Sequence, residues 1–487
     1  MIKNFKWLFL LSLSITACSS DDDNGEEAVV ITSGSADFSK YVALGDSFAA
    51  GYSDNALFKA GQENSYPNIL SQQFALAGGG TFNSPFMADD LGGFSVGGMQ
   101  IPQFPTRLYF NTATSTPMNV AGISGTDITA QVAGPINNLG VPGAKSFHLL
   151  AAGYGAANPY FKRFASAADA SVLGDALVQS PTFFSLWIGG NDVLAYATSG
   201  GSGVNQTGNL NPATYGNSDI TDPNVFAATY SQIVAKLTEN GAKGVVANLP
   251  YINALPFFTT IPYNPVPLDA NTAALLNSAN GFGQYNAGIQ FAKSQGLISQ
   301  DEADRRTIAF HAGAGNAVVM TDSYLTNLTA FGIPSYRQAT SEDFIVLPAR
   351  AFIGTQVNGN PLQVNGVSVP LADNWVLSKD EVAEVKTATD AYNATIEAVA
   401  NDKGLALVDT KAILAQLSNG GIVKDGFTLT SAYVTGGTFS LDGIHPSPRG
   451  YAFISNMFVD AINAKYGSNM PGVNLGDYRI LYPQAFQ

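Results

Sequence analysis

Residues 40–48 read Lys-Tyr-Val-Ala-Leu-Gly-Asp-Ser-Phe, a short apolar run that stops at a glycine. A nearly continuous apolar run of this length is typical of a strand that is covered on both faces of a parallel sheet. Gly45 ends the run, and the residues after Ser47 are compatible with a helix. The stretch therefore predicts a strand, a tight turn and a helix, with the Ser47 hydroxyl exposed at the sheet edge.

Similar strand signals recur along the chain and alternate with helical patterns. Three further apolar runs end at Gly189, Pro250 and Asp409, and they span residues 182–188, 244–249 and 405–408. Helix starts are marked by Asp222-Pro223, by the Ser378-to-Glu381 capping box and by Ser447-Pro448. This alternation predicts a three-layer α/β/α domain around a mainly parallel sheet.

Long Gly-, Pro- and Asn-rich stretches interrupt this pattern at residues 77–135, 195–221 and 251–375. Connections of that length exceed what a compact α/β domain needs. The last stretch contains strand-like pieces of its own at 343–347, 354–357 and 367–369, so we expect a lid or subdomain there. The second and third stretches start shortly after strand ends, so we expect them to crowd the carboxyl edge of the sheet.

The N-terminus has the features of a targeting segment. Lys3 and Lys6 precede a short apolar run, which ends in Thr-Ala-Cys18. This pattern resembles a bacterial lipobox, which implies that residues 1–17 are removed and that Cys18 is lipidated; an ordinary signal peptide is the alternative. Residues 18–37 are acidic at their start and are expected to form a flexible tether to a domain at 38–487. We therefore expect an outer-membrane lipoprotein that faces the periplasm or the cell surface.

Composition narrows the range of partners and cofactors. The net charge of −14 argues against binding nucleic acid or anionic headgroups by charge. The one cysteine excludes a disulfide within the chain and a cysteine-based metal site. We expect no metal and no cofactor, and the expected partners are an ester substrate and the membrane through the Cys18 anchor.

One of the three histidines has the surroundings of a catalytic base. A serine hydroxyl such as that of Ser47 needs a base to become a nucleophile. His148 lies in an apolar stretch and His311 has no acid nearby in sequence, but His445 follows Asp442 by three residues. A carboxylate at that spacing can fix the imidazole tautomer and stabilise its protonated form.

Acyl transfer also requires hydrogen-bond donors for an oxyanion. The sequence offers the N–H of Ser47, the N–H of Gly143 and the side-chain amide of Asn191. Each signal is weak alone because glycine turns and Asn caps are common. Their order along the chain and their position at predicted strand ends make the set informative.

Taken together, these strings resemble the four sequence blocks of the GDSL-type, or SGNH, hydrolases. The blocks are Gly45-Asp46-Ser47, Asn138 to Gly143, Gly189-Gly190-Asn191-Asp192 and Asp442 to His445. The resemblance implies a flavodoxin-like fold and ester hydrolysis through an acyl-serine intermediate. It gives Ser47 as nucleophile, His445 as base and then acid, Asp442 as orienting carboxylate, and Asp46 and Asp192 as structural residues. Gly140 is an alternative to Gly143 as the glycine donor, and the spacing from Asn138 favours Gly143.

We therefore expect a serine esterase or lipase. The alternatives are a carbohydrate O-deacetylase of the same fold and a surface glycan-binding lipoprotein without catalysis, which the intact site residues argue against. Residues 256–263 are apolar and rich in proline. They can line an acyl pocket, form a lid or anchor a buried loop.

Overall fold

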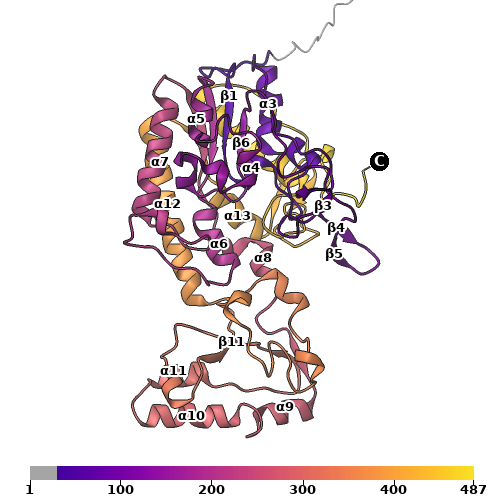
Figure 1. Ribbon diagram of the computed structural model, residues 1–487, viewed down its shortest axis with the longest axis vertical. Helices are drawn as coiled ribbons and strands as arrows, with labels where there is room; N and C mark the ends of the chain where they lie inside the picture. Colours follow the sequence, from indigo (N-terminus) through magenta and orange to yellow (C-terminus); the bar gives the residue numbers. More distant parts are fainter. Residues whose placement is uncertain (1–29, 487) are drawn as a thin grey trace, which may run out of the picture.

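The computed structural model describes residues 30–486, and a five-stranded parallel sheet lies at its centre (Figure 1). Its strands lie side by side in the order β6-β1-β7-β8-β15. Their bounds are β1 Tyr41–Gly45, β6 Asn138–Gly140, β7 Phe183–Trp187, β8 Lys243–Ala247 and β15 Ala406–Val408. Numbered along the chain, this order is 2-1-3-4-5, so the chain changes direction across the sheet between β1 and β7. The prediction of a mainly parallel sheet is confirmed.

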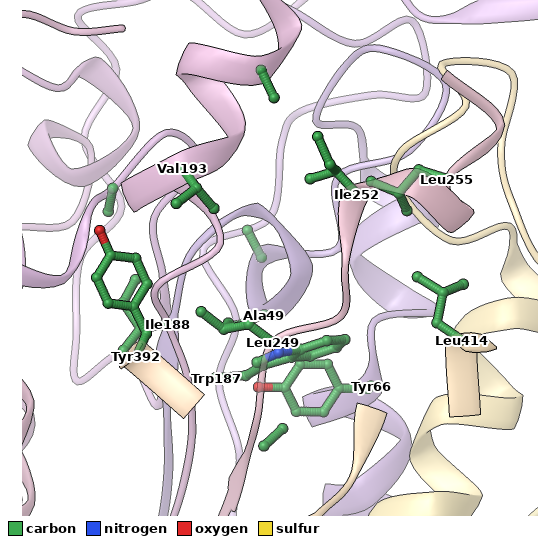
Figure 2. Packing of buried hydrophobic residues seen from close by; sticks show 14 of the residues in the cluster. Ala49, Tyr66, Trp187, Ile188, Val193, Leu249, Ile252, Leu255, Tyr392 and Leu414 are labelled. Carbon is green, nitrogen blue, oxygen red and sulfur yellow. The ribbon is translucent and has the colours of Figure 1, made fainter. Parts of the chain in front are cut away.

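Helices cover both faces of this sheet. On one face lie α5 Val172–Leu177, α7 Pro223–Thr238 and α12 Lys379–Lys403, and on the other lie α3 Tyr66–Leu76 and α14 Pro448–Tyr466. Figure 2 shows Tyr66 and Tyr392, one from each helical layer, among the buried side chains around Trp187. The ring centroids of Tyr66 and Trp187 are 5.8 Å apart. The sheet is therefore buried on both sides, which explains the continuous apolar runs.

The three predicted helix starts are confirmed, together with their capping. Asp222 accepts hydrogen bonds from Asn224 N and Val225 N at the start of α7. Ser378 and Glu381 form both bonds of the capping box that opens α12, and Ser447 caps α14. The last two helices end at glycines with left-handed backbone, as expected for helix C-termini.

Two local features differ from the sequence prediction. Asn138–Gly140, read as part of a glycine loop, forms the edge strand β6, which pairs with Ala43–Gly45. This strand is short and rich in residues with low strand propensity, so periodicity does not reveal it. The helix after the first strand, α1 Ser47–Ala50, is also only one turn long. It stops at Gly51, where φ is +85° and a Cβ would lie 2.7 Å from the Gly61 carbonyl oxygen.

The stretch at 77–135 carries two small hairpins, β2 Ser95–Val96 with β3 Met99–Gln100 and β4 Leu108–Asn111 with β5 Thr116–Asn119. The stretch at 251–375 forms most of a separate lobe at the bottom of Figure 1. Its elements are α8 Pro256–Thr259, β9 Val266–Leu268, α9 Ala270–Asn277, α10 Gly283–Ser294, α11 Gln300–Arg306, β10 Gly313–Asn316, β11 Val319–Thr321, β12 Tyr336–Gln338 and β13 Phe344–Ile345. The remaining elements are α2 Lys59–Glu63, α4 Pro159–Lys162, α6 Asn191–Thr198, α13 Thr410–Ser418, β14 Val376–Leu377, β16 Ile422–Lys424 and β17 Phe427–Leu429.

A buried ionic group lies inside the lobe. Arg337 pairs with Asp322 at 2.5 Å and with Asp343 at 2.6 Å, and all three side chains are almost fully buried. Of the strand-like pieces predicted here, only 343–347 contains a strand, β13, which pairs with β14. The pieces at 354–357 and 367–369 form isolated bridges around a short 3₁₀ turn instead of a hairpin.

The N-terminal segment contacts the domain earlier than predicted. Ser35 N donates to the carbonyl of Tyr466 at 2.8 Å, and Thr32 N donates to the side chain of Asn469 at 2.7 Å. Residues 30–37, which the sequence assigns to the tether, are therefore attached to the end of α14. Cys18 and the targeting segment lie outside the described residues. Within residues 30–486, no helix combines the length and apolar character that crossing a bilayer requires.

Candidate active site

The carboxyl ends of β1, β6 and β7 bring the predicted site residues to one edge of the sheet. Ser47 is the first residue of α1, directly after β1, and His445 lies in the turn before α14. His445 Nε2 is 2.8 Å from Ser47 Oγ, and His445 Nδ1 is 2.9 Å from Asp442 Oδ2. These distances are those of a serine–histidine–carboxylate relay. The three side chains are mostly buried, with 12% of His445 and 8% of Asp442 exposed.

Backbone N–H groups fix the Asp442 carboxylate in place. Its Oδ1 accepts from Ile444 N at 2.9 Å and from His445 N at 2.8 Å, and its Oδ2 accepts from Asn55 N at 3.0 Å. Burial acts to raise the pKa of Asp442, but the charge of His445 and these bonds outweigh it and lower the pKa. Asp442 therefore stays ionised and can hold a protonated imidazole.

The structure adds support residues that the sequence did not predict. Asp54 and Asn55 both have left-handed backbone, with φ of +49° and +63°, and this turn aims Asn55 N at Asp442. Asp54 Oδ1 accepts from Leu441 N at 2.9 Å, which ties the same turn to the His445 loop. Asp and Asn tolerate left-handed backbone better than most residues, so the Asp54-Asn55 pair was the available sequence signal for this turn.

The oxyanion donors predicted from sequence lie around a type II turn at 141–144. Ala144 N donates to the Val141 carbonyl at 3.0 Å, and Gly143 occupies the third position with φ of +79°. The Gly143 N–H has no partner among the described residues. Val141 N donates to the Gly45 carbonyl at 3.0 Å, which places this turn beside the end of β1 and Ser47.

Asn191 completes this group of donors. It begins α6 after β7, and its Nδ2 donates to the Ala144 carbonyl at 3.0 Å, which leaves one amide hydrogen for another acceptor. Gly140, the alternative glycine, is buried, and its N–H donates to Asn138 Oδ1 at 3.1 Å. The structure therefore leaves Gly143, and not Gly140, with an available N–H.

Two buried aspartates shape the loops that carry these groups. Asp46 caps α1 by accepting from Phe48 N at 3.0 Å, and burial raises the pKa of Asp46 to about 7. Asp192 accepts from Ser146 N and Ser146 Oγ, both at 2.8 Å, and burial also raises its pKa. Neither side chain is bonded to His445.

The other two histidines are placed away from this relay. His148 is half-buried, stacks on Tyr154 at a centroid distance of 4.5 Å and accepts from Lys145 N at 3.1 Å. Burial, with the charge of Lys145, lowers the pKa of His148 to about 4. His311 is exposed, and its Nδ1 lies 3.0 Å from the carbonyl oxygen of Ala312.

Two cavities lie near the relay. A narrow one of about 50 Å³ is lined by apolar residues and two threonines, and the lining includes Phe48 and Pro446, the chain neighbours of Ser47 and His445. A larger one of about 480 Å³ lies beside Asp442. Phe257, from the proline-rich segment at 256–263, lines the larger cavity, and its N–H donates to the Gly443 carbonyl at 2.9 Å. This segment therefore joins the lobe to the catalytic loop.

Among the residues that the structure describes, no three His, Cys, Asp or Glu side chains form a group suited to holding a metal ion.

Comparisons with known proteins give one structural neighbour of low similarity. No family model matches the chain, and no curated protein does. An extracellular lipase from Streptomyces rimosus aligns over 87% of this chain and 98% of its own, with 13% identity and a TM-score of 0.30. Likeness at this level does not establish a shared fold or activity.

Proposed function

We propose that this protein is a serine ester hydrolase that works through an acyl-serine intermediate. The observation that carries the proposal is the continuous relay from Asp442 through His445 to Ser47, beside the Gly143 N–H, which has no hydrogen-bond partner within residues 30–486. A hydroxyl, a base and an orienting carboxylate at these distances are the parts that acyl transfer requires.

In the first half of the reaction, His445 Nε2 accepts the proton of Ser47 Oγ while that oxygen attacks the ester carbonyl. Asp442 stabilises the imidazolium that forms. The carbonyl oxygen gains negative charge and accepts hydrogen bonds from Ser47 N, Gly143 N and Asn191 Nδ2. Each such donor lowers the barrier by roughly 3 kcal/mol.

In the second half, His445 donates its proton to the alcohol oxygen, the ester bond breaks, and the acyl group stays on Ser47. A water molecule then takes the place of the alcohol, and His445 accepts its proton as the water attacks the acyl carbon. His445 then donates this proton to Ser47 Oγ as the bond between the acyl carbon and Oγ breaks, which releases the carboxylic acid and restores the hydroxyl.

The strand order supports the finer proposal that the chain is a GDSL-type hydrolase. The order 2-1-3-4-5 is the flavodoxin-like one, in which ligands bind at the carboxyl edge between the first and third strands. Ser47 follows β1 and Asn191 follows β7, so one of them lies on each side of the place where the strand order reverses.

We propose the narrow cavity as the acyl site, because its lining includes Phe48 and Pro446, the chain neighbours of Ser47 and His445. A cavity of about 50 Å³ exceeds the roughly 10–15 Å³ that one water needs but is well below the roughly 150 Å³ cavity known to hold benzene. An acyl site of this size would take acetyl or a similarly small group, so the carbohydrate O-deacetylase remains the second candidate. An ester panel that varies acyl length and includes acetylated glycans separates the two.

A fluorophosphonate probe tests the central proposal. The probe should label the wild type and should not label Ser47→Ala. If the wild type stays unlabelled, or Ser47→Ala labels equally, the enzyme proposal is wrong and the non-catalytic glycan-binding lipoprotein becomes the better explanation. Labelling at pH 7 should also be lost in His445→Ala, because the hydroxyl then has no base.

We also propose that the protein is attached to the outer membrane of a bacterium through a lipid on Cys18. The lipobox-like sequence at residues 15–18 supports this. Metabolic labelling with palmitate should mark the wild type in cells and leave Cys18→Ser unlabelled. Equal labelling of both would contradict the anchor.

A further inference from the structure

The larger cavity beside Asp442 is built from three parts of the chain that are far apart in sequence. Leu108 and Pro117 come from the β4–β5 hairpin, Phe257 and Leu347 from the lobe, and Tyr433 from the segment before the catalytic loop. Its volume of about 480 Å³ lies within the range of pockets that bind small molecules. Both the hairpin and the lobe belong to insertions, so this cavity is specific to the insertions of this chain.

The chemistry of the relay indicates which part of an ester would reach this cavity. His445 returns its proton to the leaving alcohol oxygen, so that oxygen must lie close to Nε2. Asp442, the partner of His445, is itself part of the cavity lining. The cavity therefore adjoins the histidine side of the site, where the alcohol part of a bound ester is located.

The lining carries one basic side chain, Arg350, in an otherwise largely apolar surface. Arg350 is exposed, and no carboxylate of the described residues forms an ion pair with it. A guanidinium that is not neutralised by the protein can pair with a carboxylate, phosphate or sulfate in a two-point geometry.

We propose that this cavity receives the alcohol part of the ester and that Arg350 binds an anionic group on it. The preferred substrates would then be esters of alcohols that combine an apolar body with a carboxylate, phosphate or sulfate. This inference rests on the proposed ester hydrolase function and names a substrate class within it.

A pair of aryl acetates tests the inference directly. The 4-acetoxybenzoate anion and the neutral acetate ester 4-acetoxybenzamide share the acetyl group and the phenol ring, and at the far end a charged carboxylate is replaced by a neutral carboxamide of similar size. Replacing Arg350 by glutamine should lower kcat/KM for the anionic ester about tenfold, the value of one charge-assisted bond, mainly through KM. The neutral ester should be hydrolysed at the wild-type rate.

Two further variants sharpen the test. Arg350→Lys keeps the charge but not the planar fork, so it should retain part of the preference for the anionic ester. Arg305→Gln removes an exposed arginine from α11 of the same lobe, outside the cavity lining, and should leave both rates unchanged. Because each variant is compared with the wild type on the same two esters, their different intrinsic reactivities cancel.

The outcomes distinguish this inference from the proposed function. If Arg350→Gln changes neither ester, or slows both equally, the assignment of Arg350 is wrong while the hydrolase proposal stands. If the wild type hydrolyses neither ester and the fluorophosphonate probe does not label it, both proposals fail together. If phosphorylated or sulfated phenyl acetates show the same dependence on Arg350 as the benzoate, the site recognises charge in general.

Discussion

Replacing Asn191 by alanine gives the sharpest test of how the site works. Asn191 Nδ2 has two hydrogens, and one of them is bonded to the Ala144 carbonyl at 3.0 Å. The substitution removes the second hydrogen as an oxyanion donor, which raises the barrier by roughly 3 kcal/mol. Since about 1.36 kcal/mol corresponds to a tenfold change in rate, kcat should fall by about two orders of magnitude.

The same substitution should also have a structural effect that can be measured separately. The Ala144 carbonyl loses its side-chain donor, which destabilises the fold by about 1 kcal/mol. Denaturant unfolding measures this loss, and steady-state hydrolysis of an aryl acetate measures kcat and KM. KM should change little, because the donor acts on charge that develops in the transition state.

Leucine provides the matched comparison for Asn191, because it has a similar volume and no donor. Asn191→Leu should lose as much kcat as Asn191→Ala. If either variant keeps kcat within about threefold of the wild type, far less than a lost donor predicts, Asn191 does not donate to the oxyanion and the site has been misassigned. If KM rises while kcat is unchanged, Asn191 binds the substrate in its ground state instead.

Three further outcomes are expected. Burial raises the pKa of Glu381 to about 7. The contribution of the protonated Glu381 side chain to the free energy of unfolding is therefore fully present below pH 4.5 and is lost as the pH rises towards 7. The variant Glu381→Gln can still accept the capping bond from the backbone N–H of Ser378, but it has no carboxyl group to titrate. The unfolding free energy of this variant should therefore fall less steeply between pH 4.5 and 7, by up to about 1.4 kcal/mol per pH unit. Denaturant titrations at pH 5, 6 and 7 measure this difference. Met457 lines the narrow cavity, so Met457→Ala should enlarge it and raise kcat/KM for butyrate and hexanoate esters relative to acetate esters. If the dependence of kcat/KM on acyl length is unchanged, this cavity is not the acyl site. Prolonged treatment with EDTA should leave hydrolysis unchanged, since the relay needs no metal, and a loss that added Zn²⁺ or Ca²⁺ restores would contradict this.

The sequence predicted the central sheet because its strands are buried on both faces. The apolar runs that end at Gly45 and Gly189 are too short for a typical helix and stop at a turn residue, and the structure places strands there. The position of Ser47 and Asn191 at one edge then follows from parallel strand direction alone. The meeting of His445 with Ser47 followed from the same reasoning together with the chemistry that a serine needs.

Features that depend on tertiary contacts could not be predicted in this way. β6 is a strand because it pairs with β1, and its own Asn and Gly residues disfavour that state. The Asp54-Asn55 pair is a local signal for the left-handed turn, but no local pattern predicts that the turn will place Asn55 N against Asp442, which is 387 positions away. The cavity beside Arg350 is likewise lined in part by two insertions, and nothing periodic in their sequences predicts how they pack.

The separation of Ser47 and His445 along the chain has a consequence for biosynthesis. These residues lie 398 positions apart, and the base enters the site only when the segment before α14 packs against β1. A chain that is still being made, or one cut before residue 442, carries the nucleophile without the group that activates it. During synthesis the proposed activity can therefore arise only after His445 has been made, and its recovery during refolding would report that the first strand and the segment before α14 have come together.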